Sequence, residues 1–489
     1  MNLNTVIFPM PKEVEIIFNV LGDASHEINL VGGCIRDYFM GRPIKDYDFC
    51  TSASPEQVKE LFSQKYEVID TGLKHGTVTV VINKIPFEIT SYRIDKYDNE
   101  NTLNHRTPSE VIFSSDKQKV NLYNDLSRRD FTINAIAFDG EKFIDPFDGR
   151  ADKTKGVLKC VGNPTMRFKE DALRILRGIR FSVTHNLRIE TGTLRAMFAQ
   201  KKLLCCISKE RITKELIEIL NHPIDLKGKH QILEDVLDEL YPEYFEFFYL
   251  KTLNRQVYER VLKVFKTNTP AYFKLAFLLR CVLEDVEYSS DCFSVKKEEN
   301  NREKLLASLI KEFCQKQLKC TNDFTKKVIK IHDVGNFFYD NINLIKSSFY
   351  SRIWTGDRLF YPAGVLLHAL GKDAAELNFW TVLYISNIVD DKSILKRTNV
   401  LLRTMGKMIS DPDNYPYMFE HMRIDGDDLE LMGIKGKEIK KCFEELMGKL
   451  LMREILNDRE SLLYEALRFK KSKTLELPPG SKVDIEKKS

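Results

Sequence analysis

The chain has 489 residues, of which 43% are hydrophobic and 30% charged, and its formal net charge is only +4. This length predicts roughly two to four domains, and the small net charge restricts any nucleic-acid surface to local basic patches. Ten cysteines without a C-x-x-C pair argue against a zinc site or disulfide framework and indicate reduced thiols. The N-terminus has no signal-peptide pattern, and the longest apolar stretch, near 377–389, is too short for a membrane span. We therefore expect a soluble, cytoplasmic protein without membrane contact.

Helical spacing of apolar residues predicts a helix over 11–21, and the stretch 30–50 (LVGGCIRDYFMGRPIKDYDFC) follows it. The tandem glycines Gly32 and Gly33 let backbone N–H groups approach a polyphosphate closely. Asp46 and Asp48 are two residues apart, so in a strand both side chains lie on one face. Two such carboxylates repel each other unless a cation lies between them, and Mg²⁺ with its oxygen ligands is the usual cation.

An Asp-x-Asp pair alone is more often part of a loop or a solvated strand. Its spacing from GGxxRD, however, resembles the signature of the class II tRNA nucleotidyltransferase and poly(A) polymerase family, within the polymerase-β-like superfamily. The resemblance implies that Asp46 and Asp48 hold Mg²⁺ and are catalytic. It also implies that Gly32, Gly33 and Arg36 bind the nucleotide triphosphate.

Ser54 followed by proline predicts a helix start, and two strands are expected over 77–82 and 85–92. In the second strand Glu88 points away from the apolar side. It is a candidate third catalytic carboxylate, because a two-metal site usually needs one more oxygen ligand, but an exposed strand glutamate is an equal alternative. The polar stretch 95–121 predicts a loop, and the resemblance implies that it helps to switch from adding C to adding A.

The stretch 126–137 (LSRRDFTINAIA) resembles the second motif of the same family. Arg128 and Arg129 form a cationic pair that suits triphosphate oxygens. We expect mainly Arg129 to bind them, with a solvated arginine pair as the alternative. Asp130 and Asn134 are expected to brace the local backbone rather than contact substrate.

The stretch 167–181 (RFKEDALRILRGIRF) predicts one helix with a dense set of arginines. Apolar residues recur at helical spacing and predict a buried stripe, namely Leu173, Leu176 and Ile179. The charged residues and Gly178 are expected on the opposite side of this helix.

Those charged residues resemble the family's EDxxRxxR motif. The resemblance implies that Asp171 and Arg174 read the base of the incoming nucleotide. A carboxylate accepts from the amino group that cytosine and adenine share, and a guanidinium donates to a ring nitrogen or carbonyl. Arg177 and Arg180 would extend the positive surface toward phosphate or the tRNA end. The alternative is a surface ion pair between Asp171 and Arg174 that adds little stability.

From about residue 208 onward the pattern is almost entirely helical. The region around 275–284 resembles the metal-binding helix of HD-type phosphohydrolase modules, but Arg280 and Cys281 stand where His-Asp would be. We therefore expect neither a metal nor phosphohydrolase activity in this degenerate HD-like region. His332 and Asp333 lack further ligands and are expected to be surface or core filler.

The stretch 423–451 resembles the tail helices of bacterial members of the family. Gly436 and its neighbouring lysines would offer backbone amides and positive charge to tRNA phosphates, the lysines being Lys435, Lys437, Lys440 and Lys441. A solvated lysine face is a close alternative. The end of the chain, 470–489, has the composition of a disordered segment.

These patterns predict an α/β nucleotidyltransferase (polymerase-β-like) head followed by an all-α neck, body and tail. The expected domains are the head over 1–150, the neck with the base template over 151–222, the degenerate HD-like body over 223–345, the tRNA-binding tail over 346–469 and the disordered end over 470–489.

The activity that the resemblance implies is Mg²⁺-dependent, template-independent addition of C, C and A to the 3′ end of tRNA from CTP and ATP, with release of pyrophosphate. A poly(A) polymerase would share the head and the metals, and a CC-only tRNA nucleotidyltransferase would stop after two additions. Both alternatives stay open. The patterns do not predict the oligomeric state or a tRNA preference.

Overall fold

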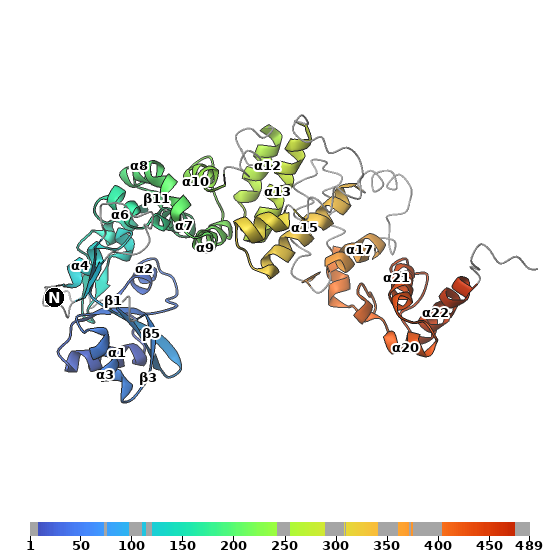
Figure 1. Cartoon of the computed structure of the whole chain (residues 1–489), viewed down its shortest axis with the longest axis horizontal. Coiled ribbons are helices and arrows are strands. Elements are labelled where there is room, and N and C mark those ends of the chain that lie inside the picture. Colours follow the sequence, from blue (N-terminus) through green and yellow to red (C-terminus); the bar gives the residue numbers. More distant parts are fainter. Residues whose placement is uncertain are drawn as a thin grey trace, which may run out of the picture. The chain divides into compact units, whose positions relative to one another are not determined.

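The computed structural model describes residues 8–72, 76–96, 110–113, 120–241, 255–288, 308, 310–340, 360–370, 373–374 and 403–474. The chain divides into two compact units: Met1–Ala271 with Lys316–Cys320, and Tyr272–Gln315 with Thr321–Ser489. Every strand of the described residues lies in the first unit, which is coloured mainly blue to green in Figure 1. The predicted division into head, neck, body and tail is finer than these two units and remains a prediction.

A seven-stranded mixed sheet lies in the first unit, with the order β3-β4-β5-β2-β1-β8-β9. Strands β2 and β5 are parallel, and the other neighbouring pairs are antiparallel. The two strands predicted over 77–82 and 85–92 are confirmed as β4 and β5. The sequence of β4 is a run of β-branched residues, which favours a strand. The strands of this sheet are β1 (Ile28–Val31), β2 (Asp48–Thr51), β3 (Glu67–Gly72), β4 (Thr77–Ile82), β5 (Ile85–Ser91), β8 (Ala137–Phe138) and β9 (Phe143–Ile144).

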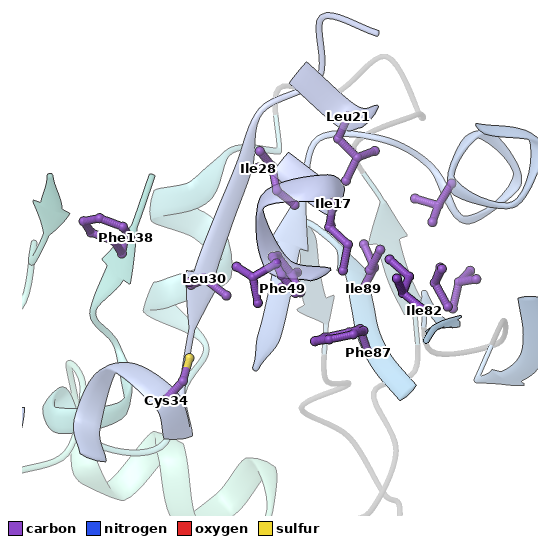
Figure 2. Close-up of a cluster of buried hydrophobic side chains, with 14 of the residues drawn as sticks. Ile17, Leu21, Ile28, Leu30, Cys34, Phe49, Ile82, Phe87, Ile89 and Phe138 are labelled. Carbon is purple, nitrogen blue, oxygen red and sulfur yellow. The ribbon is translucent and has the colours of Figure 1, made fainter. Parts of the chain in front are cut away.

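Helices α1 (Lys12–Asp23) and α3 (Pro55–Ser63) pack against one face of this sheet. Their apolar side chains and those of the strands form one buried cluster (Figure 2), which includes Ile17, Leu21, Leu30, Phe49, Phe87 and Ile89. Helix α3 begins as predicted, because the Ser54 hydroxyl accepts a hydrogen bond from the Gln57 backbone N–H at 3.2 Å. This reciprocal capping box satisfies N–H groups that a helix start leaves without partners.

A second buried cluster lies against the opposite face. It joins the sheet to the β6–β7 hairpin (Arg93–Lys96 and Glu110–Phe113) and to α4 (Leu122–Ser127). Its members are Val31, Cys50, Tyr92, Ile112, Val120, Leu126, Ala135, Ala137 and Val161. The sheet is therefore covered on both faces around β1, β2 and β8.

Strand alternation decides where the acidic residues of the sheet point. Phe49 belongs to the first cluster and Cys50 to the second, so Asp48 shares the face of Cys50. Glu88 stands between buried Phe87 and Ile89 and is exposed. The expectation that Glu88 faces away from the apolar side is confirmed.

The rest of the first unit is mainly helical. Its longer helices are α6 (Pro164–Glu170), α7 (Leu173–His185), α8 (Thr191–Gln200), α9 (Lys209–Leu220), α10 (Ile232–Leu240) and α12 (Arg255–Phe265).

The expectation of one helix over 167–181 is wrong, because the backbone breaks between α6 and α7. Asp171 is extended (φ −149°, ψ 105°), and its carboxylate accepts the Leu173 N–H at 3.0 Å. An aspartate at this place competes for the free N–H groups of a helix start, which favours a new helix over continuation. Gly178 also lies on the buried side, since a Cβ there would stand 2.3 Å from Met197 Cε. The predicted apolar stripe of α7 is buried as expected.

The described residues of the second unit form helices, with α13 beginning at the unit boundary: α13 (Ala271–Tyr288), α15 (Asn322–Asp340), α17 (Phe360–Leu370), α20 (Gly426–Leu431), α21 (Lys437–Leu451) and α22 (Arg459–Thr474). Arg280 and Cys281 lie within α13, but their side chains are outside the description. His332 is buried in α15, as a core residue. Helix α22 includes 470–474, so that part of the segment predicted to be disordered is helical, and 475–489 lies outside the described residues. None of the described helices is long and apolar enough to cross a membrane.

Candidate active site

A glycine turn connects β1 to α2 (Gly33–Phe39), at the edge where β2 begins. Gly32 has φ +75°, a conformation that favours glycine. A Cβ on Gly32 would stand 3.4 Å from Arg129 Nη1 and 3.6 Å from Asp48 Oδ2. The turn therefore lies directly against one predicted phosphate-binding cation and one predicted metal ligand.

The next glycine is flanked in the same way. A Cβ on Gly33 would stand 3.7 Å from Arg36 Nη2 and 3.7 Å from Asp46 Oδ1. The two glycines thus place the other members of the predicted triphosphate and metal sites at one point of the fold. Sequence motifs separated by most of the head meet at this turn.

The carboxylates come from the start of β2 and from its parallel neighbour. Asp48 is the first residue of β2 and lies in register with Val31 of β1 and Glu88 of β5. Asp46 is exposed and precedes the strand, so only one of the two aspartates has strand geometry. Burial, followed by the Asp46 and Glu88 carboxylates, raises the pKa of Asp48 to about 6.

Burial and repulsion from the neighbouring carboxylates thus disfavour the charged form of Asp48 more than the nearby arginines favour it. A divalent cation with oxygen ligands would remove that repulsion, so Asp46 and Asp48 fit a metal site. Within the described part of the chain, no three His, Cys, Asp or Glu side chains have the arrangement of a preformed metal cluster. Glu88 is therefore an electrostatic neighbour of Asp48, and its role as a ligand remains a prediction.

Arg36 links the turn to α7. Its Nε donates to Asp37 Oδ1 at 2.9 Å and its Nη1 donates to Asn134 Oδ1 at 3.2 Å. The guanidinium also lies 5.3 Å from the centre of the Phe181 ring, a cation–π distance. Asn134 in turn donates to Asp130 Oδ1 at 3.0 Å. These contacts agree with bracing roles for Asn134 and Asp130.

The side chains of Asp171 and Arg174 do not pair with each other but with other residues. Asp171 Oδ2 accepts from Arg211 Nη2 of α9 at 2.9 Å. Arg174 Nη1 donates to Glu170 Oε2 at 2.7 Å, and its Nη2 donates to the Arg128 carbonyl at 2.9 Å. Protein groups therefore hold both side chains in place on several sides, an arrangement typical of preorganised sites.

Arg177 and Arg180 extend the same partly exposed side of α7 and are also paired. Arg177 donates to Asp130 Oδ2 through Nε at 2.8 Å, and Arg180 Nε donates to Glu215 Oε2 at 2.6 Å. Together with Arg174 they recur every three residues, and each has a carboxylate partner, so their role as a positive surface for phosphate or the tRNA end remains a prediction.

Three partners of the predicted site residues are not predicted from the sequence, namely Asp125, Arg211 and Glu215. The spacing of Asp125 three and four residues before an arginine pair was a usable helix signal. Arg211 and Glu215 are four residues apart on a predicted helix, but nothing in that spacing says which surface they meet. The structure places them against Asp171 and Arg180.

Chemically, the site presents two acidic groups, two arginines and a glycine turn that admits a close ligand. Cations of this kind hold phosphate oxygens, and a metal between acidic groups stabilises charge that develops during displacement at phosphorus. Arg174, which contacts the carbonyl of the residue before Arg129, and Asp171 carry donors and acceptors of the kind that a base edge requires.

Comparison with known proteins agrees with this geometry. Residues 28–159 match the family described as the poly A polymerase head domain. The chain is 34% identical over 338 residues to the CCA-adding enzyme of Staphylococcus aureus, covering 69% of this chain and 75% of that protein. It is 42% identical over 204 residues to the CCA-adding enzyme of Lactobacillus delbrueckii subsp. bulgaricus, covering 42% of this chain and 48% of that protein.

Solved structures show the same architecture. The Bacillus stearothermophilus CCA-adding enzyme in complex with CTP gives a TM-score of 0.62 at 23% identity, covering 95% of this chain and 99% of that chain. The Thermotoga maritima CCA-adding enzyme in complex with tRNA gives 0.56 at 19% identity, covering 95% and 97%. These likenesses concern the fold and confirm a nucleotidyltransferase head with a helix-rich remainder. With the sequence identity to the S. aureus protein, they lead to one conclusion: the chain belongs to the family of CCA-adding enzymes.

Proposed function

We propose that this chain adds C, C and A to the 3′ end of tRNA, using CTP and ATP and releasing pyrophosphate. One observation above all supports the proposal. Asp46 and Asp48 lie beside Arg36 and Arg129 at the Gly32–Gly33 turn, in a chain whose relatives are CCA-adding enzymes. The residues that we propose as metal ligands and as triphosphate-binding groups are therefore adjacent, as nucleotidyl transfer requires.

Nucleotidyltransferases of this family generally use a divalent metal, and we propose Mg²⁺ held by Asp46 and Asp48. When bound, the metal would activate the primer 3′-hydroxyl and neutralise charge on the leaving pyrophosphate. The role of Glu88 as a further catalytic carboxylate rests on its register with Asp48.

The change Glu88→Gln tests that role. If Glu88 helps to bind the metal, the Mg²⁺ concentration for half-maximal incorporation rises by about tenfold, the loss expected for one weakened ligand set. An unchanged Mg²⁺ titration would leave Glu88 as an exposed strand residue.

We propose that separate groups of residues bind the triphosphate and the base of the incoming nucleotide. Gly32, Gly33, Arg36 and Arg129 bind the triphosphate, while Asp171 and Arg174 select the base, with Arg177 and Arg180 supplying positive charge along α7. The Asp171 carboxylate remains able to accept from an amino group, because each of its oxygens has two acceptor positions.

For the tRNA, the proposed contacts lie in the tail. Gly436 has φ +57° and precedes α21, and four lysines around it are exposed, namely Lys435, Lys437, Lys440 and Lys441. Exposed lysines beside a helix start suit phosphate contacts that position RNA without reading its sequence. Cytoplasmic activity is part of the same proposal.

The experiment supplies Mg²⁺, a tRNA that lacks its 3′ end, and labelled CTP and ATP, separately and together. Addition of two C residues and then one A, lost in Asp48→Ala, is the expected result. Long A tails on unrelated RNA would identify a poly(A) polymerase, and a stop after CC would identify a CC-only enzyme. No incorporation at all would refute the enzymatic proposal.

A further inference from the structure

Asp125 is a buried carboxylate outside the set of predicted site residues. It lies in the short helix α4, which begins with a reciprocal cap between Asn121 and Asn124. Its side chain is 0% exposed, yet it is bound by the guanidiniums of both arginines that follow α4. A buried charge needs such partners, because an unpaired one is strongly unfavourable.

The two arginines use Asp125 differently. Arg128 donates through Nε and Nη2 to Asp125 Oδ1, and its Nη1 lies 3.5 Å from Asp95 Oδ2 of β6. Arg129 donates through Nη2 to Asp125 Oδ2 at 3.0 Å. Arg128 thus lies between two acidic residues, whereas Asp125 fixes only one edge of Arg129.

The other edge of Arg129 faces the glycine turn. Its Nη1 is 3.4 Å from the position that a Cβ on Gly32 would take, and Asp48 Oδ2 is 3.6 Å from that same position. Its Nε is buried, and none of the described residues accepts a hydrogen bond from it. Buried N–H groups without an acceptor are rare in native proteins, and each one needs an explanation such as a missing water or ligand.

We propose that Asp125 is a positioning residue of the nucleotide site, which holds Arg129 with its free N–H groups directed at the triphosphate of the incoming nucleotide. The proposal rests on the proposed function for the identity of that ligand. Asp125 itself does not touch the nucleotide, since its carboxylate is fully enclosed. Burial alone would raise the pKa of Asp125, but the Arg128 and Arg129 guanidiniums hold it below its ordinary value, so the carboxylate stays charged at neutral pH.

A purely structural role makes a different prediction. Buried ion pairs are weak contributors to net stability, although removing one partner leaves a costly unpaired charge. A structural Asp125 would change the melting temperature and the active fraction, but not the affinity of folded protein for nucleotide. A positioning Asp125 changes that affinity, and it does so equally for CTP and ATP, because both share the triphosphate.

The test measures equilibrium binding of CTP and ATP by calorimetry, with Mg²⁺ and without tRNA, for wild type, Asp125→Asn and the control Asp152→Asn. Asp152 is another buried carboxylate of the first unit, but it accepts from the Thr132 hydroxyl at 2.8 Å. We expect Asp125→Asn to weaken both nucleotides by the same factor, about tenfold or more, as for loss of a well-placed charge-assisted contact. Asp152→Asn should bind within about twofold of wild type. Wild-type affinity in Asp125→Asn, or weakening of only one nucleotide, overturns the proposal.

A double-mutant cycle with Arg129→Ala tests whether Asp125 affects nucleotide binding through Arg129. On the Arg129→Ala background, Asp125→Asn should weaken CTP binding by less than about twofold, because the group it positions is already absent. A full additional loss would overturn the proposal. If Asp125→Asn does not fold, Asp125→Glu keeps the charge and displaces it by one methylene. Folded Asp125→Glu with unchanged CTP affinity would also overturn it.

Inorganic tripolyphosphate with Mg²⁺ separates this inference from the proposed function. The probe has no base and needs no tRNA, so its binding does not depend on which nucleotides are added. Loss of tripolyphosphate affinity in Asp125→Asn by the factor seen for CTP supports the positioning role, even if wild type failed to extend tRNA. Retained tripolyphosphate affinity overturns it.

Discussion

Two regions of the candidate site, the start of β2 and helix α7, differ in how far their charges are compensated by other residues of the chain. At the start of β2, burial and then the neighbouring Asp46 and Glu88 carboxylates raise the pKa of Asp48 to about 6. Along α7, each arginine of the stripe has a carboxylate partner, such as Glu170 for Arg174 and Glu215 for Arg180. A cation from outside the chain would stabilise the first region, whereas the charges of the second region are neutralised and oriented by the protein itself. The proposed metal site thus keeps carboxylates that repel one another, whereas the arginines of the proposed base-recognition surface are already paired.

The largest effect is expected for the carboxylates at the start of β2. Asp48→Asn should lower CTP incorporation by about a thousandfold or more, because a catalytic metal contributes several kcal/mol and each 1.36 kcal/mol is a factor of ten. The same change should raise the melting temperature of metal-free protein, since it removes a repelled charge. Incorporation assays and metal-free thermal melts measure both effects. Near-wild-type incorporation would show that the metal ligands lie elsewhere.

At the α7 region, Asp171→Asn should change the discrimination between nucleotides more than the rate of nucleotidyl transfer. Asparagine can donate as well as accept, so discrimination of CTP from UTP should fall by about 10- to 100-fold, corresponding to one base-edge hydrogen bond. The measurement is the ratio of kcat/KM for CTP and UTP. If both rates fall together and the ratio stays constant, Asp171 supports the fold through Arg211 and does not read the base.

Removing one partner of an ion pair along α7 should lower the stability of the protein. Glu215 is 8% exposed and accepts from Arg180 at 2.6 Å, so Glu215→Gln leaves that guanidinium without a neutralising charge. We expect a loss of about 1–3 kcal/mol in the free energy of unfolding, measured by denaturant titration. Glu218→Gln is the matched control, because Glu218 is an exposed residue of the same helix. Equal losses in both variants would contradict the importance of the pairing.

The smallest effect concerns the acid sensitivity that His185, the last residue of α7, gives to the folded state. Burial, followed by Arg36, Arg42 and Arg180, lowers the pKa of His185 to about 3. The folded state therefore binds fewer protons than the unfolded state, whose histidine titrates near 6.5. The contribution of His185 to stability is complete above pH 6.5 and declines as the pH falls below it, by at most about 1.4 kcal/mol per pH unit.

His185→Phe retains a ring against Phe181, on which His185 now stacks at 5.8 Å. This variant should lose less stability than wild type between pH 7 and pH 5, as followed by denaturant titration. Parallel pH profiles for the two proteins would assign the acid sensitivity to other groups.

Much of the fold and part of the site could be predicted from local sequence. The capped start of α3, the strands β4 and β5, and the outward direction of Glu88 all follow from residue spacing and turn chemistry. So does the apolar stripe of α7. These features depend on the directions of side chains in regular helices and strands, which near neighbours in the chain determine.

Other features depended on segments far apart in the chain. Sequence spacing could not show that α6 ends at Asp171, that Gly178 packs against Met197, or that β2 and β5 are parallel neighbours that bring Glu88 beside Asp48. It also gave no partner for Asp171, which Arg211 of α9 supplies. The sequence by itself determined which chemical groups this protein has and, in the regular strands and the apolar stripe of α7, the face on which they lie. Only the tertiary structure decided which charges are neutralised and which stay available for a ligand, because that depends on which surfaces pack together.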